Sequence, residues 1–238
     1  MNEARYHCAN RPEGAEYYPR LTALQFGNLR EAAMRFSLLL AAILACLLAS
    51  CRAEDRTPGT IVLQPLGRVS ASDISTARHG IEAMFSARVE VRPAVALPKN
   101  AYYPPRRRYR ADDLISFLAG RTNSKRVIGL TAVDVSTTKD AVKDWGVLGL
   151  GNETMRACVV STFRMGRKRV PATVFRARLV NVCDHELGHT YGLPHCPNPR
   201  CVMADAHGKL STFDDSTGDF CVDCRAKLGR FLRAGGRS

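Results

Sequence analysis

The stretch His185-Glu186-Leu187-Gly188-His189 carries the strongest chemical signal in the chain. Its two histidines are four positions apart, which is about one turn of an α-helix, so both imidazoles project from the same helix face. Two such imidazoles can bind one tetrahedral zinc ion. Glu186 is rotated about 100° around the helix from His185, close enough to reach a zinc-bound water without being a ligand. The spacing therefore predicts a zinc site with Glu186 as its general base.

The residues that follow predict a third zinc ligand. Gly192 lacks a Cβ and can adopt the left-handed conformation that ends a helix and reverses the chain. Pro194 keeps the helix from continuing, so His195 can return to the metal. Three neutral imidazoles leave the fourth zinc position open for water, as a catalytic site requires. The alternative, a buried helix with three coincidental histidines, leaves the glycine and the acid unexplained.

The cysteines divide into two groups. Three of them lie in or before an apolar leader, and the other six lie in the part of the chain that is expected to fold. Cys158 and Cys183 are expected to be reduced core residues, because free cysteine packs like a small hydrophobe. The other four have the spacing of metal ligands: Cys196, Cys201, Cys221 and Cys224.

The leader indicates export. Residues 36–50 form an uninterrupted apolar run, shorter than the roughly 20 residues of a membrane-spanning helix and suited to the core of a secretory signal. The run ends in LASC at 48–51, which resembles the lipobox of bacterial lipoproteins, where the signal is cut before a cysteine that is then lipidated. Residues 34–51 are therefore expected to be a lipoprotein-type signal that starts at Met34, with Cys51 as the lipidated residue.

This interpretation also assigns the first residues and the compartment. If translation begins at Met34, residues 1–33 are a mis-annotated upstream extension. The signal predicts an exported protein that a lipid anchor holds to the membrane, facing the periplasm or the cell exterior. The alternatives are an uncleaved apolar anchor helix and a chance apolar stretch, and the protein is expected in the cytoplasm if the leader is not used.

The rest of the chain is expected to form one α/β domain at 60–232, after a short polar linker at 52–59. Apolar or alternating runs predict strands at 60–66, 89–91, 126–135, 145–151 and 156–164. Apolar residues at helical spacing predict helices at 70–84, 112–118 and 171–191, the first of them begun by a capping pair, Ser70 and Asp73. The segment 97–110 is rich in proline and arginine and is predicted to be a loop.

The complete pattern resembles the archaemetzincin family. It reads HELGHTYGLPHC, then four residues to CVM, seventeen to the next cysteine, and finally VDC. The upstream strand VIGLTAVDV and the stretch AYYPPRRRYRADDLISFL are also similar, so the resemblance covers about residues 60–228. It implies a compact, metzincin-like α/β domain with a mixed twisted sheet, packed helices and a C-terminal four-cysteine zinc unit.

The resemblance also implies two zinc ions per chain. The catalytic ion would be bound by His185, His189 and His195, with Met203 in the turn beneath it. The structural ion would be bound by the four C-terminal cysteines, Cys196, Cys201, Cys221 and Cys224. Two disulfides are the alternative for these cysteines, because exported compartments oxidise thiols, although zinc that binds early would protect the thiolates.

Together these features predict zinc-dependent peptide-bond hydrolysis, in which Glu186 activates the zinc-bound water. A peptide or protein substrate is expected to lie extended along an edge strand around Val147–Gly151, and the protein is expected to be monomeric. One alternative is a zinc-binding protein of the same fold that has little or no peptidase activity and acts by partner binding. The net charge of +13 also suggests a nucleic-acid-binding module, but its basic clusters are scattered, so nucleic acid is not an expected partner.

Overall fold

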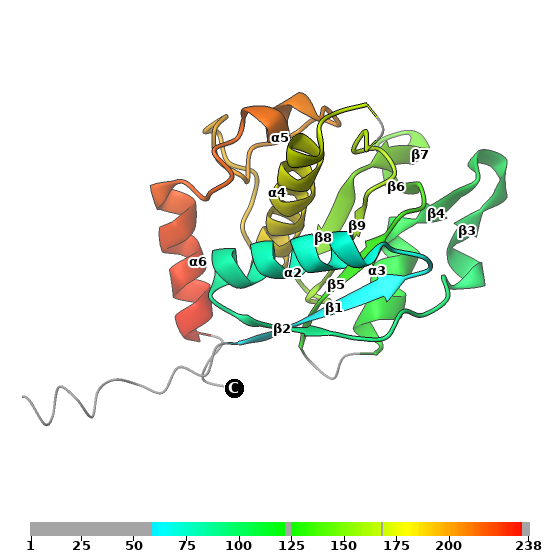
Figure 1. Cartoon of the computed structure of the whole chain (residues 1–238), viewed down its shortest axis with the longest axis horizontal. Coiled ribbons are helices and arrows are strands. Elements are labelled where there is room, and N and C mark those ends of the chain that lie inside the picture. The colour runs from blue at the N-terminus through cyan, green and yellow to red at the C-terminus, as the bar shows by residue number, and fades with distance from the viewer. Residues whose placement is uncertain (1–58, 122–124, 168, 235–238) are drawn as a thin grey trace, which may run out of the picture. The chain divides into compact units, whose positions relative to one another are not determined.

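The computed structural model describes residues 59–121, 125–167 and 169–234 (Figure 1). The upstream extension, the signal with Cys51 and the linker as far as residue 58 lie outside the described residues, so the predictions about them stay predictions. Within the described residues, no helix is both long and apolar enough to cross a membrane.

The main sheet has five strands in the order β2-β1-β5-β9-β8. Four of them run parallel: β1 (Thr60–Leu66), β2 (Arg88–Val91), β5 (Arg126–Thr131) and β9 (Ala157–Ser161). The fifth, β8 (Gly149–Asn152), pairs antiparallel with β9 and forms one edge. The central strands are almost continuously apolar because both faces of this sheet are covered.

Helices cover both faces of this sheet. On one face, α2 (Ala71–Phe85) and α4 (Ala172–Thr190) pack over alternate strand residues such as Leu63 and Ile128. On the other face, α3 (Ala111–Ala119) packs over the intervening residues such as Val62 and Val127. The α/β fold class is therefore the one that the sequence predicted. Figure 1 shows α2 crossing in front of the sheet, with α4 beside it.

A second sheet holds four short strands in the order β3-β4-β6-β7. Their bounds are Tyr102–Tyr103, Arg108–Arg110, Val135–Lys139 and Val142–Val147. The prediction that 97–110 is a loop is therefore wrong. The segment contains β3, β4 and two short 3-10 helices, Lys99–Ala101 and Pro104–Arg106. These strands form because β4 pairs in parallel with β6, a partner distant in sequence that the local composition of 97–110 does not reveal.

Two predicted strands are each divided between the sheets. The apolar run 126–135 leaves the main sheet after Thr131 and enters the second sheet at Val135. The run 145–151 begins in β7 and continues in β8, with the buried Leu148 between them. Apolar character persists through both crossings because each sheet buries its own residues, so hydropathy alone does not mark the change of sheet.

The ends of the helices follow local chemistry. Ser70 caps α2, its side chain accepting a hydrogen bond from the Asp73 backbone N–H, as the capping pair predicted. Helix α4 begins after Pro171 and ends at Thr190, in agreement with the predicted helix at 171–191. The short α5 (Ser211–Asp215) and the C-terminal α6 (Val222–Ala234) were not predicted. Both follow the histidine motif, and α5 packs against α4.

Candidate active site

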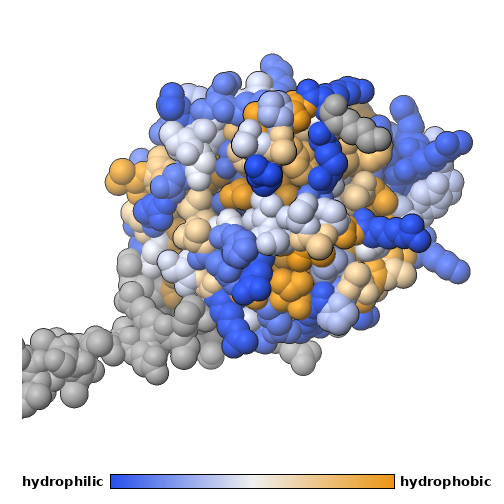
Figure 2. Space-filling model, in the orientation of Figure 1, coloured by the Kyte–Doolittle hydropathy of each residue, from blue (hydrophilic) through white to orange (hydrophobic). Residues whose placement is uncertain are grey.

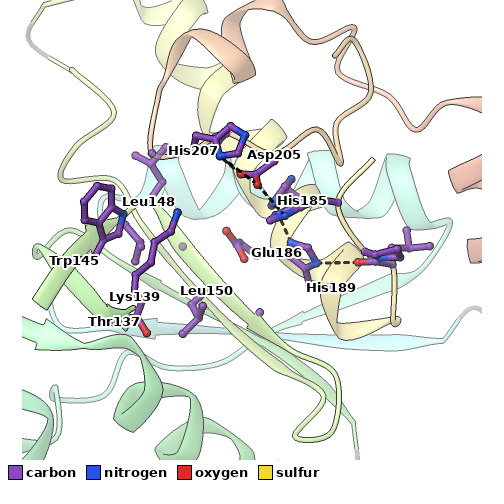
Figure 3. Close-up of a pocket in the computed structure, with 18 of the residues that line it drawn as sticks. Thr137, Lys139, Trp145, Leu148, Leu150, His185, Glu186, His189, Asp205 and His207 are labelled. Carbon is purple, nitrogen blue, oxygen red and sulfur yellow. Dashed lines mark hydrogen bonds and ion pairs between the residues drawn. The ribbon is translucent and has the colours of Figure 1, made fainter. Parts of the chain in front are cut away.

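The three motif histidines come together at the end of α4 (Figure 3). Their nitrogen ligand atoms all lie within 4.8 Å of one another. Helix α4 supplies His185 and His189 from one face, and the Nε2 atoms of these two residues are 3.0 Å apart. The turn after the helix supplies His195, whose ring centroid is 4.9 Å from that of His189.

Hydrogen bonds to the other ring nitrogen orient each histidine. The Nδ1 atom of His185 lies 2.8 Å from the Val202 carbonyl oxygen, and that of His189 lies 2.8 Å from the Leu193 carbonyl oxygen. A carbonyl oxygen can only accept, so both Nδ1 atoms carry the proton and both Nε2 atoms present a lone pair. Two lone pairs that face each other at 3.0 Å repel unless a cation lies between them. The donor set therefore fits a metal ion.

The histidines are also in the protonation state that a metal requires. Burial lowers the pKa of His185 to about 3, and the neighbouring His189 adds to this effect. Burial likewise lowers the pKa of His189. Both imidazoles are therefore neutral near pH 7, and neutral imidazole is the form that binds zinc.

The chain reverses after α4 as the sequence predicted. Gly192 has a φ of 77°, and the Leu193 N–H donates to the Gly188 carbonyl oxygen at 3.1 Å. The reversal leaves His195 half exposed, with its Nδ1 atom 3.3 Å from Asp205 Oδ2. Sequence reasoning missed Asp205, and its only signal was a carboxylate two residues beyond Met203. A carboxylate behind a metal-binding histidine orients the ring and increases its basicity.

Glu186 lies in the wall of the cleft beside the histidines. Its side chain is buried, and burial raises its pKa to about 8. The edge strand approaches it closely, because a Cβ added to Gly149 would lie 2.6 Å from Glu186 Cγ. At Gly151, an added Cβ would lie 2.8 Å from His189 Cβ. Only glycine fits at these two positions of β8, a constraint that the sequence motif does not reveal.

Met203 packs directly under the motif helix. A Cβ on Gly188 would lie 2.5 Å from the Met203 sulfur, so the glycine of the motif makes room for this methionine. The Met203 carbonyl oxygen accepts a hydrogen bond of 2.8 Å from the Cys196 N–H. Met203 is fully buried and serves as a packing floor, the place that the resemblance implied for it.

The four C-terminal cysteines form a second cluster. Their sulfur atoms all lie within 4.8 Å of one another, and those of Cys196 and Cys221 are 3.7 Å apart. This separation is far longer than the roughly 2.05 Å of a disulfide bond, and the six cysteines among the described residues are free. A hydrogen bond from the Cys224 backbone N–H, at the start of α6, lowers the pKa of Cys221. The arrangement suits a closed four-thiolate metal site.

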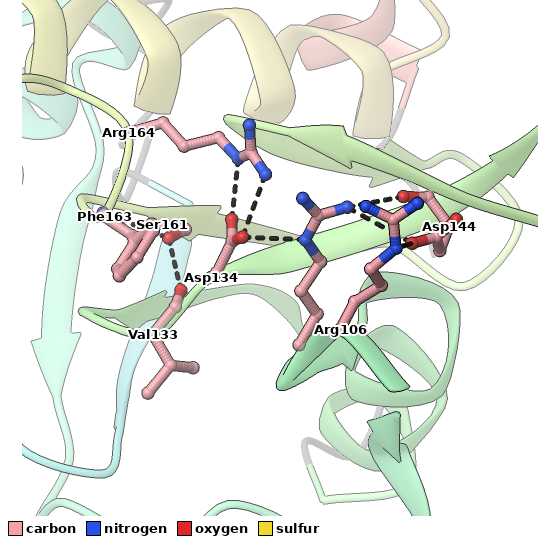
Figure 4. Close-up of polar contacts among 8 residues, drawn as sticks. Arg106, Val133, Asp134, Asp144, Ser161, Phe163 and Arg164 are labelled. Atoms are coloured by element: carbon pink, nitrogen blue, oxygen red, sulfur yellow. Dashed lines mark hydrogen bonds and ion pairs between the residues drawn. The ribbon is translucent and has the colours of Figure 1, made fainter. Parts of the chain in front are cut away.

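An ion-pair network fixes the second sheet beside the site (Figure 4). Asp134 accepts two hydrogen bonds from Arg164, at 2.6 and 2.9 Å, and one from Arg108 at 2.8 Å. Asp144 pairs with Arg106 at 3.3 Å and with Arg108 at 3.4 Å. Three of the chain's arginines are thus paired with two aspartates within the fold. Figure 2 shows hydrophilic residues spread over this face of the molecule, with one group at the projecting β3–β4 end.

The histidines open into a cleft of about 580 Å³. One side is formed by β8 and by the hairpin of β6 and β7. The other side is formed by α4, by the turn at 192–195 and by the loop at 205–208. A buried carboxylate beside three imidazoles that could hold a metal ion, in such a cleft, is the arrangement of a metal-dependent hydrolase.

Fold and site together define a zinc metallopeptidase. Residues 71–230 match the sequence profile of Peptidase family M54. The chain belongs to this family, as do the archaemetzincins that it resembles. The archaemetzincin of Halobacterium salinarum strain R1 is 32% identical over 168 residues, which cover 68% of this chain and 94% of the relative. That of Methanopyrus kandleri is 33% identical over 159 residues, which cover 66% and 86%.

Solved archaemetzincin structures share the fold. The crystal structure of the Methanopyrus kandleri protein superimposes with a TM-score of 0.65 at 28% identity, and the match covers 76% of this chain and 99% of that one. The Archaeoglobus fulgidus protein, which was solved in complex with malonate, gives a TM-score of 0.61 at 28% identity, with 71% and 99% covered. The predicted family is thereby confirmed.

Proposed function

We propose that this metallopeptidase cleaves peptide bonds with Glu186 as the general base for the attacking water. The observation that carries the proposal is the convergence of three imidazoles, whose candidate ligand atoms lie within 4.8 Å of one another, beside a buried carboxylate. Zinc held by His185, His189 and His195 supplies a Lewis acid that polarises the scissile carbonyl and lowers the pKa of water. Glu186 accepts the proton of the attacking water and passes it to the leaving amine. Burial raises the pKa of Glu186, and a zinc ion beside it would lower that pKa again, towards the ionised form that accepts a proton.

The edge strand β8 is the proposed binding site for the peptide backbone. It forms one edge of the main sheet and lines the cleft directly opposite Glu186 and His189. An extended peptide can add to such an edge by backbone hydrogen bonds, which hold the scissile bond in place whatever its side chains. Gly149 and Gly151 keep this edge close to α4, so the added peptide lies against the metal site.

We further propose two zinc ions per chain, the catalytic ion and a structural ion at Cys196, Cys201, Cys221 and Cys224. The support is the presence of two separate clusters of ligand atoms, each within 4.8 Å, among the described residues. Lipid anchoring at Cys51 and export remain predictions from the leader. A role in partner binding without hydrolysis is not favoured, since the base and all three histidine ligands are in place.

The substitution Glu186→Gln tests the mechanism. It keeps the shape of the side chain and removes its ability to take a proton. We expect zinc content to match that of the parent and peptide hydrolysis to fall by about 10²- to 10⁴-fold. Hydrolysis of internally quenched peptides and elemental analysis on the same samples measure both quantities. A variant that hydrolyses peptides as fast as the parent does would refute the role of Glu186.

A further inference from the structure

One wall of the cleft is built by the hairpin of β6 and β7. Thr137, Thr138 and Lys139 all line the cleft although they are consecutive in one strand. In a regular strand their side chains would alternate between the two faces. Here the pairing register shifts between Thr137 and Lys139, and such an irregularity re-aims side chains. Trp145, paired with Thr137 on β7, lines the same wall. We call these four residues the Lys139–Trp145 wall.

Lys139 is the charged group of this wall. It is the one lysine or arginine among the described residues that line the cleft. Its Nζ atom lies 5.4 Å from the centroid of the Trp145 ring, within the range of a cation–π contact. Figure 3 shows the two side chains next to each other, across the cleft from the histidines on α4. Among the described residues no carboxylate forms an ion pair with Lys139.

The carboxylates that share the cleft are engaged elsewhere. Asp205 faces the imidazoles of His195 and His207 at 3.3 and 3.4 Å, and Lys139 is near enough to help lower its pKa without forming an ion pair with it. Glu186 lies beside the metal-binding histidines. Glu153 lies against Gly192, where an added Cβ would be 2.6 Å from its Oε1 atom. The ammonium group of Lys139 is therefore available for a negative charge that a ligand brings.

The Trp145 ring lies near Gly208 in the loop at 205–208. A Cβ added to Gly208 would be 3.6 Å from Trp145 Cζ2, so the ring packs against the loop at 205–208. Even so, 38% of Trp145 remains exposed. The Thr137 and Thr138 hydroxyls donate to Asp112 and to the Lys143 carbonyl oxygen, so the carboxylate-binding group of the wall is Lys139. An aromatic face next to an ammonium group can hold the aliphatic stem of an acidic residue and also its carboxylate.

The geometry points to a carboxylate-accepting subsite at the Lys139–Trp145 wall. This inference rests on the proposed peptidase function and adds its substrate class. The subsite selects peptides that place a negative charge on the side of the scissile bond where β8 begins. Two sources supply that charge, the side chain of an aspartate or glutamate and the free carboxylate at the end of a peptide.

Trp145 provides a direct readout of binding, because it is the only tryptophan in the chain. We would titrate the zinc-loaded Glu186→Gln chain with acetylated, amidated hexapeptides and follow tryptophan fluorescence. Each peptide carries glutamate or glutamine at one position, and that position is moved along the sequence. At one position the glutamate peptide should bind about fivefold more tightly than its glutamine partner. The same neutral peptide with a free carboxylate in place of the amide tests the second source.

Three variants show whether Lys139 is responsible. Lys139→Gln should remove the preference for the negative charge, and Lys139→Glu should transfer it to a peptide that carries lysine at the same position. Lys143→Gln is the matched control, since Lys143 is exposed on the same hairpin and does not line the cleft. It should keep the preference of the parent. Equal affinity for the charged and neutral peptides, or a preference that Lys139→Gln leaves intact, would overturn the inference.

Hydrolysis by the parent separates this inference from the proposed function. The ratio of kcat/KM for the glutamate and glutamine peptides should match the binding preference. If both peptides are cleaved at equal rates, the peptidase function stands and the subsite is refuted. If neither peptide is cleaved but fluorescence shows a preference that depends on Lys139, the subsite stands and the peptidase function is refuted.

Discussion

At the scale of single residues, the short distance between β8 and Glu186 depends on Gly149, which has no side chain. Gly149 faces Glu186 so closely that an added Cβ would lie 2.6 Å from Cγ and 2.8 Å from Oε1. Contacts this short force a neighbour to move, and the neighbour here is the proposed base. The sequence motif names Glu186 but not the strand residue that determines its position.

We therefore expect Gly149→Ala to reduce peptide hydrolysis by about tenfold or more while zinc content stays at the parent value. The added methyl displaces the Glu186 carboxylate, whereas the three histidines stay in place. Gly120→Ala is the control, since its added Cβ would meet its nearest neighbour at an ordinary 3.7 Å. Unchanged hydrolysis in Gly149→Ala would show that the strand does not position the base.

At the scale of elements, the short helix α5 is fastened to α4 beside the metal site. Asn181 donates to the Phe213 carbonyl oxygen at 2.9 Å. Arg178 donates to both carboxylate oxygens of Asp214, at 2.7 and 2.6 Å. The Phe213 ring packs edge-on against His185, with 5.5 Å between ring centroids. The Arg178–Asp214 pair thus holds in place a helix that covers one of the metal-binding histidines.

The pair makes stability depend on pH. The hydrogen bond from Arg178 lowers the pKa of Asp214 below its ordinary value of 3.8. A lowered carboxyl pKa stabilises the folded state at pH values above the unfolded pKa, and this stabilisation is lost as pH falls through the folded pKa. Arg178→Met should therefore lower the free energy of unfolding at pH 6, and the difference from the parent should shrink as pH falls below the ordinary Asp214 pKa of 3.8. What remains at low pH is the part that comes from the hydrogen bond of Arg178 to the Met165 carbonyl oxygen.

Denaturant unfolding across this pH range measures the difference. Arg176→Met is the matched control, because Arg176 is exposed on the same helix and should change stability little at either pH. A difference between parent and Arg178→Met that is as large at low pH as at pH 6 would mean that Arg178 does not stabilise the fold through the charge of Asp214.

The same elements show how far sequence reasoning reached. The motif helix and its left-handed end at Gly192 follow from local periodicity and turn chemistry, so the spacing alone predicted them. The sequence pattern did not predict the strand boundaries near Thr131 and Leu148, because the apolar runs continue across the change of sheet. Asp205 and Gly149 were also missed, since their roles come from contacts between distant segments. Local patterns reveal the ligands, whereas the residues that orient the ligands emerge only from tertiary packing.

At the scale of the whole molecule, the two clusters of candidate metal ligands are joined by the chain itself. His195 and Cys196 are neighbours in sequence but belong to different clusters. The Cys201–Ala204 segment carries one cysteine ligand, the carbonyl oxygen that orients His185, and the methionine floor. A structural zinc bound by the cysteines would therefore hold the segment that forms the lower wall of the catalytic site.

The measurement that tests the account most directly is zinc per chain together with peptide hydrolysis in the same samples. The comparison needs the parent, His185→Ala/His189→Ala and Cys221→Ser/Cys224→Ser, all purified without chelator. We predict two zinc ions in the parent and one in each double variant, with hydrolysis lost in the histidine variant. A parent that binds no zinc under any reconstitution, or a histidine variant that still hydrolyses peptides at the parent rate, would contradict the account.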